Sequence, residues 1–117
     1  MALTTKFAPS SNAVPLDRRL SPRYTVQIPI DLRKEDTAGL LRLETTDLSR
    51  GGCYVHLAKT LVLGTYVQAT LWLDSCPVCV RGRVVTCHPQ FGNGIMFLDF
   101  KDNAEELLKR YLEAIAL

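Results

Sequence analysis

The sequence predicts an all-β fold with a C-terminal helix, a small antiparallel barrel on which the helix packs. In several short segments apolar and polar residues alternate with the period of a half-buried strand, and the last segment has the period of a helix. Closely spaced strands followed by one amphipathic helix are typical of this architecture. The 117 residues, 47% hydrophobic and 22% charged, have ordinary globular composition, which excludes a disordered or collagen-like chain.

The first residues set the expected domain boundary. Residues 1–16 contain prolines and small polar residues without a sustained period, so we expect a flexible leader followed by one domain over residues 17–117. The leader lacks the long apolar centre of a secretory signal, and no apolar run approaches the roughly 20 residues that cross a bilayer. We therefore expect a cytoplasmic protein whose four cysteines are reduced.

The first half of the domain contains three expected strands. Tyr24, Val26, Ile28 and Ile30 alternate with polar residues and Pro29, and a proline belongs at an edge or a strand end. The expected elements are, in order, a strand over Tyr24–Ile30, a polar break over Arg33–Gly39, a strand over Leu40–Thr46, a turn over Asp47–Gly52 and a strand over Cys53–Leu57.

The second half adds three more strands. Tyr66–Leu73 and Val78–Cys87 each keep the alternating pattern, and Ile95–Phe100 forms the last strand. The residues Gly92, Asn93 and Gly94 tolerate positive φ angles, which predicts a hairpin turn before that strand.

The tail has helical periodicity. Leu108, Tyr111, Leu112 and Ile115 recur at the spacing of one helix face. We expect Asp102 to cap the helix with Glu105 as the reciprocal acid, and Lys109 and Arg110 to lie toward the negative end of the helix dipole.

A cluster of arginines precedes the first strand. The net charge is only +2, too small for a surface that wraps nucleic acid, but Arg18, Arg19 and Arg23 fall within six residues. Pro22 excludes a continuous helix, so Arg19 and Arg23 lie on an extended or turned arm, about 13 Å apart on one side if fully extended. Two guanidinium groups so placed suit a ligand with two anionic groups and guanine bases. The alternative is a solvated cluster, with Asp17 as one partner.

A second polar cluster, Asp47-Leu48-Ser49-Arg50-Gly51-Gly52, lies on the connection between two expected strands. The carboxylate of Asp47 complements the N1–H and N2–H donors of guanine, and the Ser49 hydroxyl can bond an anion or a base. Gly51 and Gly52 permit positive φ and leave room for a ligand near the backbone. The alternative is an ordinary turn started by the aspartate.

Together the two clusters resemble the PilZ family, whose hallmarks are an RxxxR arm and a (D/N)xSxxG turn, here Arg19-Leu-Ser-Pro-Arg23 and Asp47-Leu-Ser-Arg-Gly-Gly52. The resemblance extends over about residues 17 to 115. It implies a six-stranded antiparallel barrel that binds the bacterial second messenger cyclic di-GMP, usually as an intercalated pair, with the arginine arm closing over the ligand. Many relatives place an aromatic residue near the end of the fifth strand, where this chain has Thr86, Cys87 and His88.

Carried over by position, the resemblance implies roles for individual residues. Arg19 and Arg23 would contact phosphates and guanines, with Arg18 as an additional contact, and Arg50 is a weaker candidate. Asp47 and Ser49 would bind polar groups of guanine, and Gly52 would allow close approach. The expected protein is a cyclic di-GMP receptor without a cofactor that changes its contacts with a downstream protein. A homodimer is left open.

Other functions have weaker support in the sequence. A PilZ-like protein interaction module that does not depend on the nucleotide is the main alternative, and a single-stranded nucleic-acid binder would need more exposed aromatic residues. Cys76, Cys79, Cys87 and His88 could ligate zinc, but the adjacent Cys87 and His88 diverge in a strand, which favours ordinary strand cysteines. No catalytic arrangement is found, so we expect no enzymatic activity.

Overall fold

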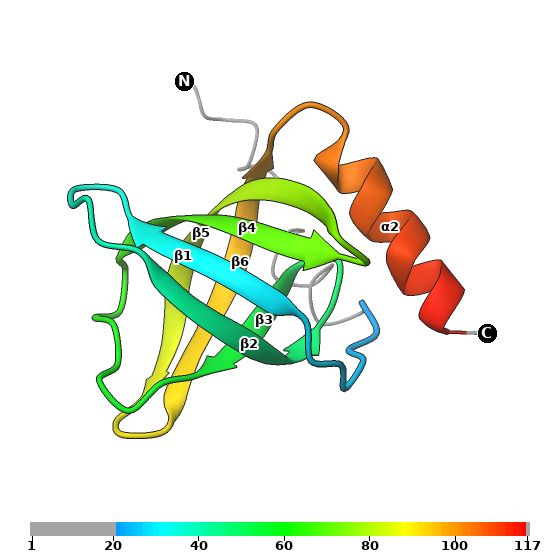
Figure 1. Cartoon of the computed structure of the whole chain (residues 1–117). Helices are drawn as coiled ribbons and strands as arrows, with labels where there is room; N and C mark the ends of the chain where they lie inside the picture. The colour runs from blue at the N-terminus through cyan, green and yellow to red at the C-terminus, as the bar shows by residue number, and fades with distance from the viewer. Residues whose placement is uncertain (1–20, 117) are drawn as a thin grey trace.

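The computed structural model describes residues 21–116, which form a closed six-stranded antiparallel barrel with a helix beside it (Figure 1). Around the barrel the strands follow the order β1-β2-β3-β6-β5-β4. The predicted fold class is therefore confirmed. The elements are β1 Pro29–Lys34, β2 Leu41–Leu48, β3 Gly52–His56, β4 Tyr66–Leu73, β5 Cys76–His88, β6 Gly92–Phe100 and the helix α2 Ala104–Ile115.

The barrel interior is filled by the apolar residues of one parity on each strand. Ile30, Val55 and Leu71 have no exposed surface, as expected when period-2 alternation turns one side of every strand toward a common core. Helix α2 packs against β5 and buries Leu108 and Leu112, two members of the predicted apolar stripe. The sequence pattern thus identified the inward side of the strands and two of the buried positions on the helix.

The prediction of a first strand over Tyr24–Ile30 was wrong, because β1 begins only at Pro29. The preceding residues instead lie along β2. Tyr24 and Leu48 exchange two backbone hydrogen bonds of 2.9 and 3.0 Å. Further along the segment, hydrogen bonds are made by the Thr45 side chain. Its Oγ1 accepts from the Ile28 N–H at 3.1 Å and donates to the Val26 carbonyl at 2.7 Å. A side chain therefore satisfies backbone groups that a regular strand would pair with another backbone.

The predicted turn at Gly92–Gly94 was also wrong, because these residues lie inside β6. The chain turns at residues 89–91, where Gln90 has a φ of 72°. The glycines are needed for close packing instead. A Cβ at Gly92 would lie 2.2 Å from the Val55 carbonyl oxygen, and one at Gly94 would lie 2.3 Å from Thr86 Oγ1.

The start of the helix differs from the predicted capping arrangement. Asn103, not Asp102, occupies the N-cap position, and its side chain makes no capping hydrogen bond. Asp102 has a φ of 54°, outside the helical region. The last turn holds no basic residue, and Arg110 pairs instead with Glu106 one turn earlier, at 3.1 Å. Within residues 21–116 no helix has the length and apolarity to traverse a bilayer.

Candidate functional site

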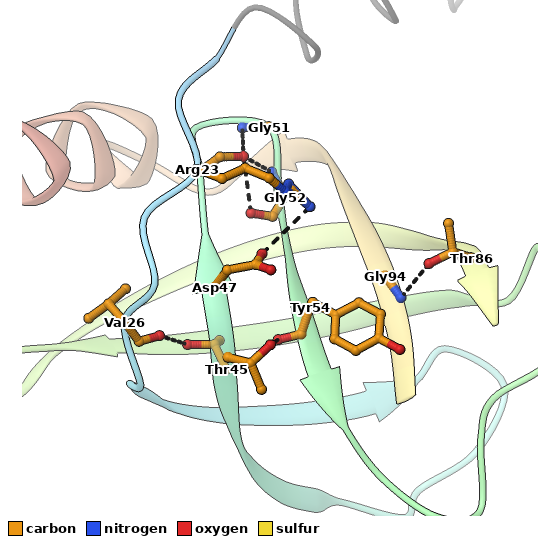
Figure 2. A network of polar contacts seen from close by, with 11 residues as sticks. Arg23, Val26, Thr45, Asp47, Gly51, Gly52, Tyr54, Thr86 and Gly94 are labelled. Carbon is orange, nitrogen blue, oxygen red and sulfur yellow. Dashed lines mark hydrogen bonds and ion pairs between the residues drawn. The ribbon is translucent and has the colours of Figure 1, made fainter. Parts of the chain in front are cut away.

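Two charged residues from the separate sequence clusters meet on the outer surface of the barrel. Arg23 Nη2 lies 3.6 Å from Asp47 Oδ1 (Figure 2). The side chain of Arg23 is 52% exposed and that of Asp47 is 30% exposed. Asp47 Oδ1 itself is shielded from solvent and accepts no hydrogen bond from the residues that the structure describes. The pair is longer than a hydrogen bond, so both groups retain binding capacity.

A β-bulge in β2 turns Asp47 outward. Thr45 pairs with Val55 and Asp47 pairs with Tyr54, so Thr46 is the extra residue on β2. Without it, the two-residue period would send both Thr45 and Asp47 into the core; with it, Thr45 and Leu48 are buried and Asp47 lies on the surface. The sequence pattern predicted a turn beginning at Asp47 and no bulge, and this prediction was wrong because Asp47 lies within β2. The three-residue step from Thr45 to the apolar Leu48 is the signal that could have revealed it.

The segment that carries Arg23 is held beside β2. Tyr24, the residue after Arg23, forms two backbone hydrogen bonds with Leu48, the residue after Asp47. This attachment explains why the two clusters converge. Arg18 and Arg19, predicted to act with Arg23, lie outside the described residues.

Ser49 organises the turn between β2 and β3. Its side chain is fully buried, and its Oγ accepts from the N–H groups of Gly51 and Gly52 at 3.2 Å each. The hydroxyl donates to the Gly52 carbonyl at 3.3 Å, and the Ser49 N–H donates to the same carbonyl at 2.8 Å. Every polar group of this side chain is thus engaged by the turn itself, as in a serine-stabilised turn.

Gly52 brings β3 close to β6. A Cβ at this position would lie 2.2 Å from the Ile95 carbonyl oxygen, a distance that no side chain can tolerate. The expected positive φ is not found, since Gly64 is the only glycine with a positive φ in the described part of the chain. Gly52 therefore permits strand packing, and Arg50 beside it is exposed at the tip of the turn.

The surface continues from Asp47 across three strands. Tyr54 on β3 pairs with both Asp47 and Gly94, and Gly94 pairs with Thr86 on β5. The Thr86 hydroxyl accepts from the Gly94 N–H at 2.9 Å. These outward residues form one row over the barrel (Figure 2). Neither Tyr54 nor Gly94 was predicted from the sequence to belong to this surface. The signal for Tyr54 is its place among the alternate residues of the predicted strand that face outward.

The charged pair influences a cysteine beneath it. Cys53 is fully buried, and the pKa of its thiol is raised to about 12, mainly by desolvation and also by the negative charge of Asp47, while the positive charge of Arg23 acts in the opposite direction. Cys53 is thus a neutral core residue. Cys76 and Cys79 are exposed on β5, and within residues 21–116 no group of three or more His, Cys, Asp or Glu gathers as a metal site.

Comparisons with known proteins agree with the fold and with the family that the sequence resembles. The family model of the PilZ domain matches residues 17–114. The crystal structure of the PilZ domain of CeSA, from a cellulose synthesizing bacterium, superposes with a TM-score of 0.65 and 23% identity, over 83% of this chain and 100% of that chain. The Bacillus subtilis inhibitor of motility, MotI/DgrA, gives a TM-score of 0.70 at 14% identity, over 85% of this chain and 52% of that one. The search of curated proteins found no match.

Proposed function

Because this chain belongs to the PilZ domain family, we propose that it is a receptor for cyclic di-GMP that signals by altering its contacts with another protein and catalyses no reaction. The observation that carries the proposal is the convergence of Arg23 and Asp47 on one face of the barrel. A guanine dinucleotide presents both anionic phosphates and bases with polar edges. A guanidinium and a carboxylate side by side complement these two kinds of group.

The loose ion pair between Arg23 and Asp47 suits an exchange of partners. Exposed pairs of this kind contribute roughly 0 to 1 kcal/mol to stability, so separating them costs little. A phosphate of the ligand binds the Arg23 guanidinium through two parallel hydrogen bonds, which replace the single long contact with Asp47. The N1–H and N2–H groups of a guanine donate to the carboxylate, whose Oδ1 accepts no hydrogen bond from the described residues.

The other residues of the two motifs support this exchange. Ser49 holds the turn that ends β2, and Gly52 lets β3 follow β6 closely, so together they fix the position of Asp47. Arg18 and Arg19 precede the anchored segment, and we assign to them further contacts with phosphates and guanine faces. Arg50, at the exposed tip of the turn, has a lesser role.

Signalling requires a difference in ligand affinity between two states of the receptor, because a ligand shifts an equilibrium only by such a preference. The residues that follow Arg23 are hydrogen-bonded to β2 through Tyr24 and Thr45. We place the ligand-dependent change before this anchor, in the part of the arm that contains Arg19. A downstream protein would recognise the arm together with the ligand that it covers.

Isothermal titration of the native chain tests the proposal. Cyclic di-GMP should bind in the micromolar range or tighter, while GTP and a single-stranded oligonucleotide should bind far more weakly. Asp47→Ala should abolish measurable micromolar binding, whereas Arg33→Ala, which removes an exposed arginine from β1, should not. Failure of the native chain to bind cyclic di-GMP would overturn the proposal in favour of a nucleotide-independent interaction module, and preferential oligonucleotide binding would favour the nucleic-acid alternative.

A further inference from the structure

Tyr54 is the cross-strand neighbour of Asp47 on the outer surface of the barrel, and its ring extends from β3 over β6 (Figure 2). The two residues face each other across the β2–β3 ladder, and cross-strand neighbours in such a pair have Cβ atoms about 5 Å apart. A flat molecule whose edge reaches Asp47 would therefore extend over Tyr54. Tyr54 is half-buried, so part of its ring remains open to solvent.

Glycines on β6 allow this ring to lie close to the sheet. A Cβ added to Gly92 would lie 2.8 Å from Tyr54 Cε2 and 3.1 Å from Cζ. The ring thus occupies the space that a side chain at Gly92 would take. Gly94, directly opposite Tyr54, also leaves its outward position without a side chain. Because neither glycine has a side chain that projects from the sheet, a flat ligand can lie close to the surface beside Asp47.

Hydrogen bonding and ring contacts fix the orientation of Tyr54. Its hydroxyl shares a 2.8 Å hydrogen bond with His88 Nδ1 on β5. The His88 ring is 5.8 Å away at an interplanar angle of 45°, and the His56 ring is 6.2 Å away at 80°. Both histidines pair with Gly92, His56 from β3, the strand of Tyr54 itself, and His88 from β5, so the Tyr54 ring lies between them. A ring held in this way can stack on a ligand without first losing much rotational freedom.

We propose that Tyr54 stacks on a guanine base whose polar edge binds Asp47, and that His88 is a positioning residue for the Tyr54 ring. This inference rests on the proposed function. Stacking selects for an aromatic base of any kind, and the adjacent carboxylate selects for one with N–H donors on that edge. Guanine has two adjacent donors, N1–H and N2–H, that can bond both oxygens of a carboxylate, whereas adenine has its N6–H donor beside the acceptor N1, which repels a carboxylate oxygen. The pair Tyr54 and Asp47 therefore selects cyclic di-GMP over cyclic di-AMP.

Nuclear magnetic resonance of the native protein with cyclic di-GMP tests the stacking directly. We expect cross-relaxation between the guanine H8 proton and the ring protons of Tyr54. Tyr54→Leu should weaken binding about ten- to hundredfold, which is the effect expected from losing one base–aromatic contact. Tyr54→Phe keeps the ring and should bind within a few-fold of the native protein. His88→Ala should weaken binding by about the same few-fold factor as Tyr54→Phe, and it should cause no further loss in Tyr54→Phe, because that variant lacks the hydroxyl through which His88 acts.

Controls separate failure of this inference from failure of the proposed function. Tyr66→Leu removes a partly exposed tyrosine from β4 and should leave the affinity unchanged. If the native protein binds cyclic di-GMP and Asp47→Ala abolishes binding, but cross-relaxation to Tyr54 is absent, the stacking role is overturned alone. If the native protein does not bind cyclic di-GMP, both are overturned. Cross-relaxation requires no substitution, so the test holds even if Tyr54→Leu does not fold.

Discussion

Arg23 Nη2 and Asp47 Oδ1 lie 3.6 Å apart, although the two residues belong to separate sequence motifs. Two features cause this proximity: the hydrogen bonds of Tyr24 to Leu48, which anchor the arm, and the bulge at Thr46, which turns Asp47 outward. Neither feature belongs to the residues that define the motifs. The candidate surface therefore depends on backbone geometry that the motifs themselves do not encode.

Two substitutions of Arg23 should show whether ligand binding needs only its positive charge or also the planar shape of the guanidinium. Arg23→Ala should weaken cyclic di-GMP binding by about 1.5 to 3 kcal/mol, roughly ten- to more than hundredfold, the range for a hydrogen bond to a charged group. Arg23→Lys should restore only part of the affinity, since an ammonium cannot make the two parallel bonds of a guanidinium. Titration calorimetry measures both. Equal affinity for Arg23→Lys and the native chain would show that charge alone is needed.

The stability of Arg23→Ala distinguishes a binding residue from a folding residue. Because Arg23 is more than half exposed and its ion pair is long, we expect the free energy of unfolding to change by less than about 1 kcal/mol. Denaturant unfolding with Arg33→Ala as the matched variant provides this measurement. A larger loss would mean that the arm depends on the ion pair, and the loss of binding would then have a structural cause.

Ser49→Ala should destabilise the protein by about 1 to 3 kcal/mol. The substitution removes the acceptor for two backbone N–H groups in a buried turn, and unsatisfied buried donors cost energy in this range. Thr37→Ala, at an exposed position in the β1–β2 loop, should have little effect. An unchanged free energy of unfolding for Ser49→Ala would contradict the structural role. It would favour instead the ligand contact that the motif implies for Ser49.

The barrel could be predicted from sequence because its strands keep a simple period. Tyr66–Leu73 was predicted with both ends correct, since alternation there is unbroken and polar residues flank it. The strand before Pro29 was mispredicted although its alternation is real: Tyr24 and Val26 are half-buried and Ile28 is buried. Alternation indicates which side of an extended segment is buried. It does not indicate whether the backbone hydrogen bonds of the segment go to another strand or, as here, to the Thr45 side chain.

The candidate surface was only partly predictable. Motif residues identified Asp47, but the position of its side chain depends on a bulge, and the role of Gly52 depends on a contact with Ile95 on another strand. Gly92 and Gly94 were predicted to form a turn because their contacts with neighbouring strands cannot be seen in the sequence. A glycine required by close packing and a glycine required by a positive φ cannot be told apart without the neighbouring strand.

Gly52→Ala should be strongly destabilising, by about 1 to 3 kcal/mol or more, as for other overpacking substitutions. The added Cβ would lie 2.2 Å from the Ile95 carbonyl oxygen, which is backbone and cannot rotate away. Gly39→Ala is the matched control, because a Cβ there has nothing within 4 Å. Thermal unfolding of the two variants should differ clearly. Equal stability would show that β3 and β6 can move apart at this point without loss of packing.

Cys53 should make the protein less stable at alkaline pH. Burial and the nearby Asp47 charge raise the pKa of its thiol from 9.0 to about 12 in the folded protein. Between these values the unfolded chain loses the proton and the folded chain keeps it, so the free energy of unfolding falls as pH rises, by at most about 1.4 kcal/mol per pH unit from this group. Below pH 9 the thiol is protonated in both states and contributes no dependence on pH.

The measurement is the difference in pH dependence between the native chain and Cys53→Ala, because the two proteins differ only in this side chain. We expect the variant to be less stable overall because of the cavity, yet to lose stability less steeply above pH 9. A thiol reagent supplies an independent check: at pH 8 the exposed Cys76 and Cys79 should react at once, and Cys53 only on unfolding. Rapid modification of Cys53 in the folded protein would mean that the region under Asp47 opens to solvent, and the steep alkaline dependence should then disappear as well.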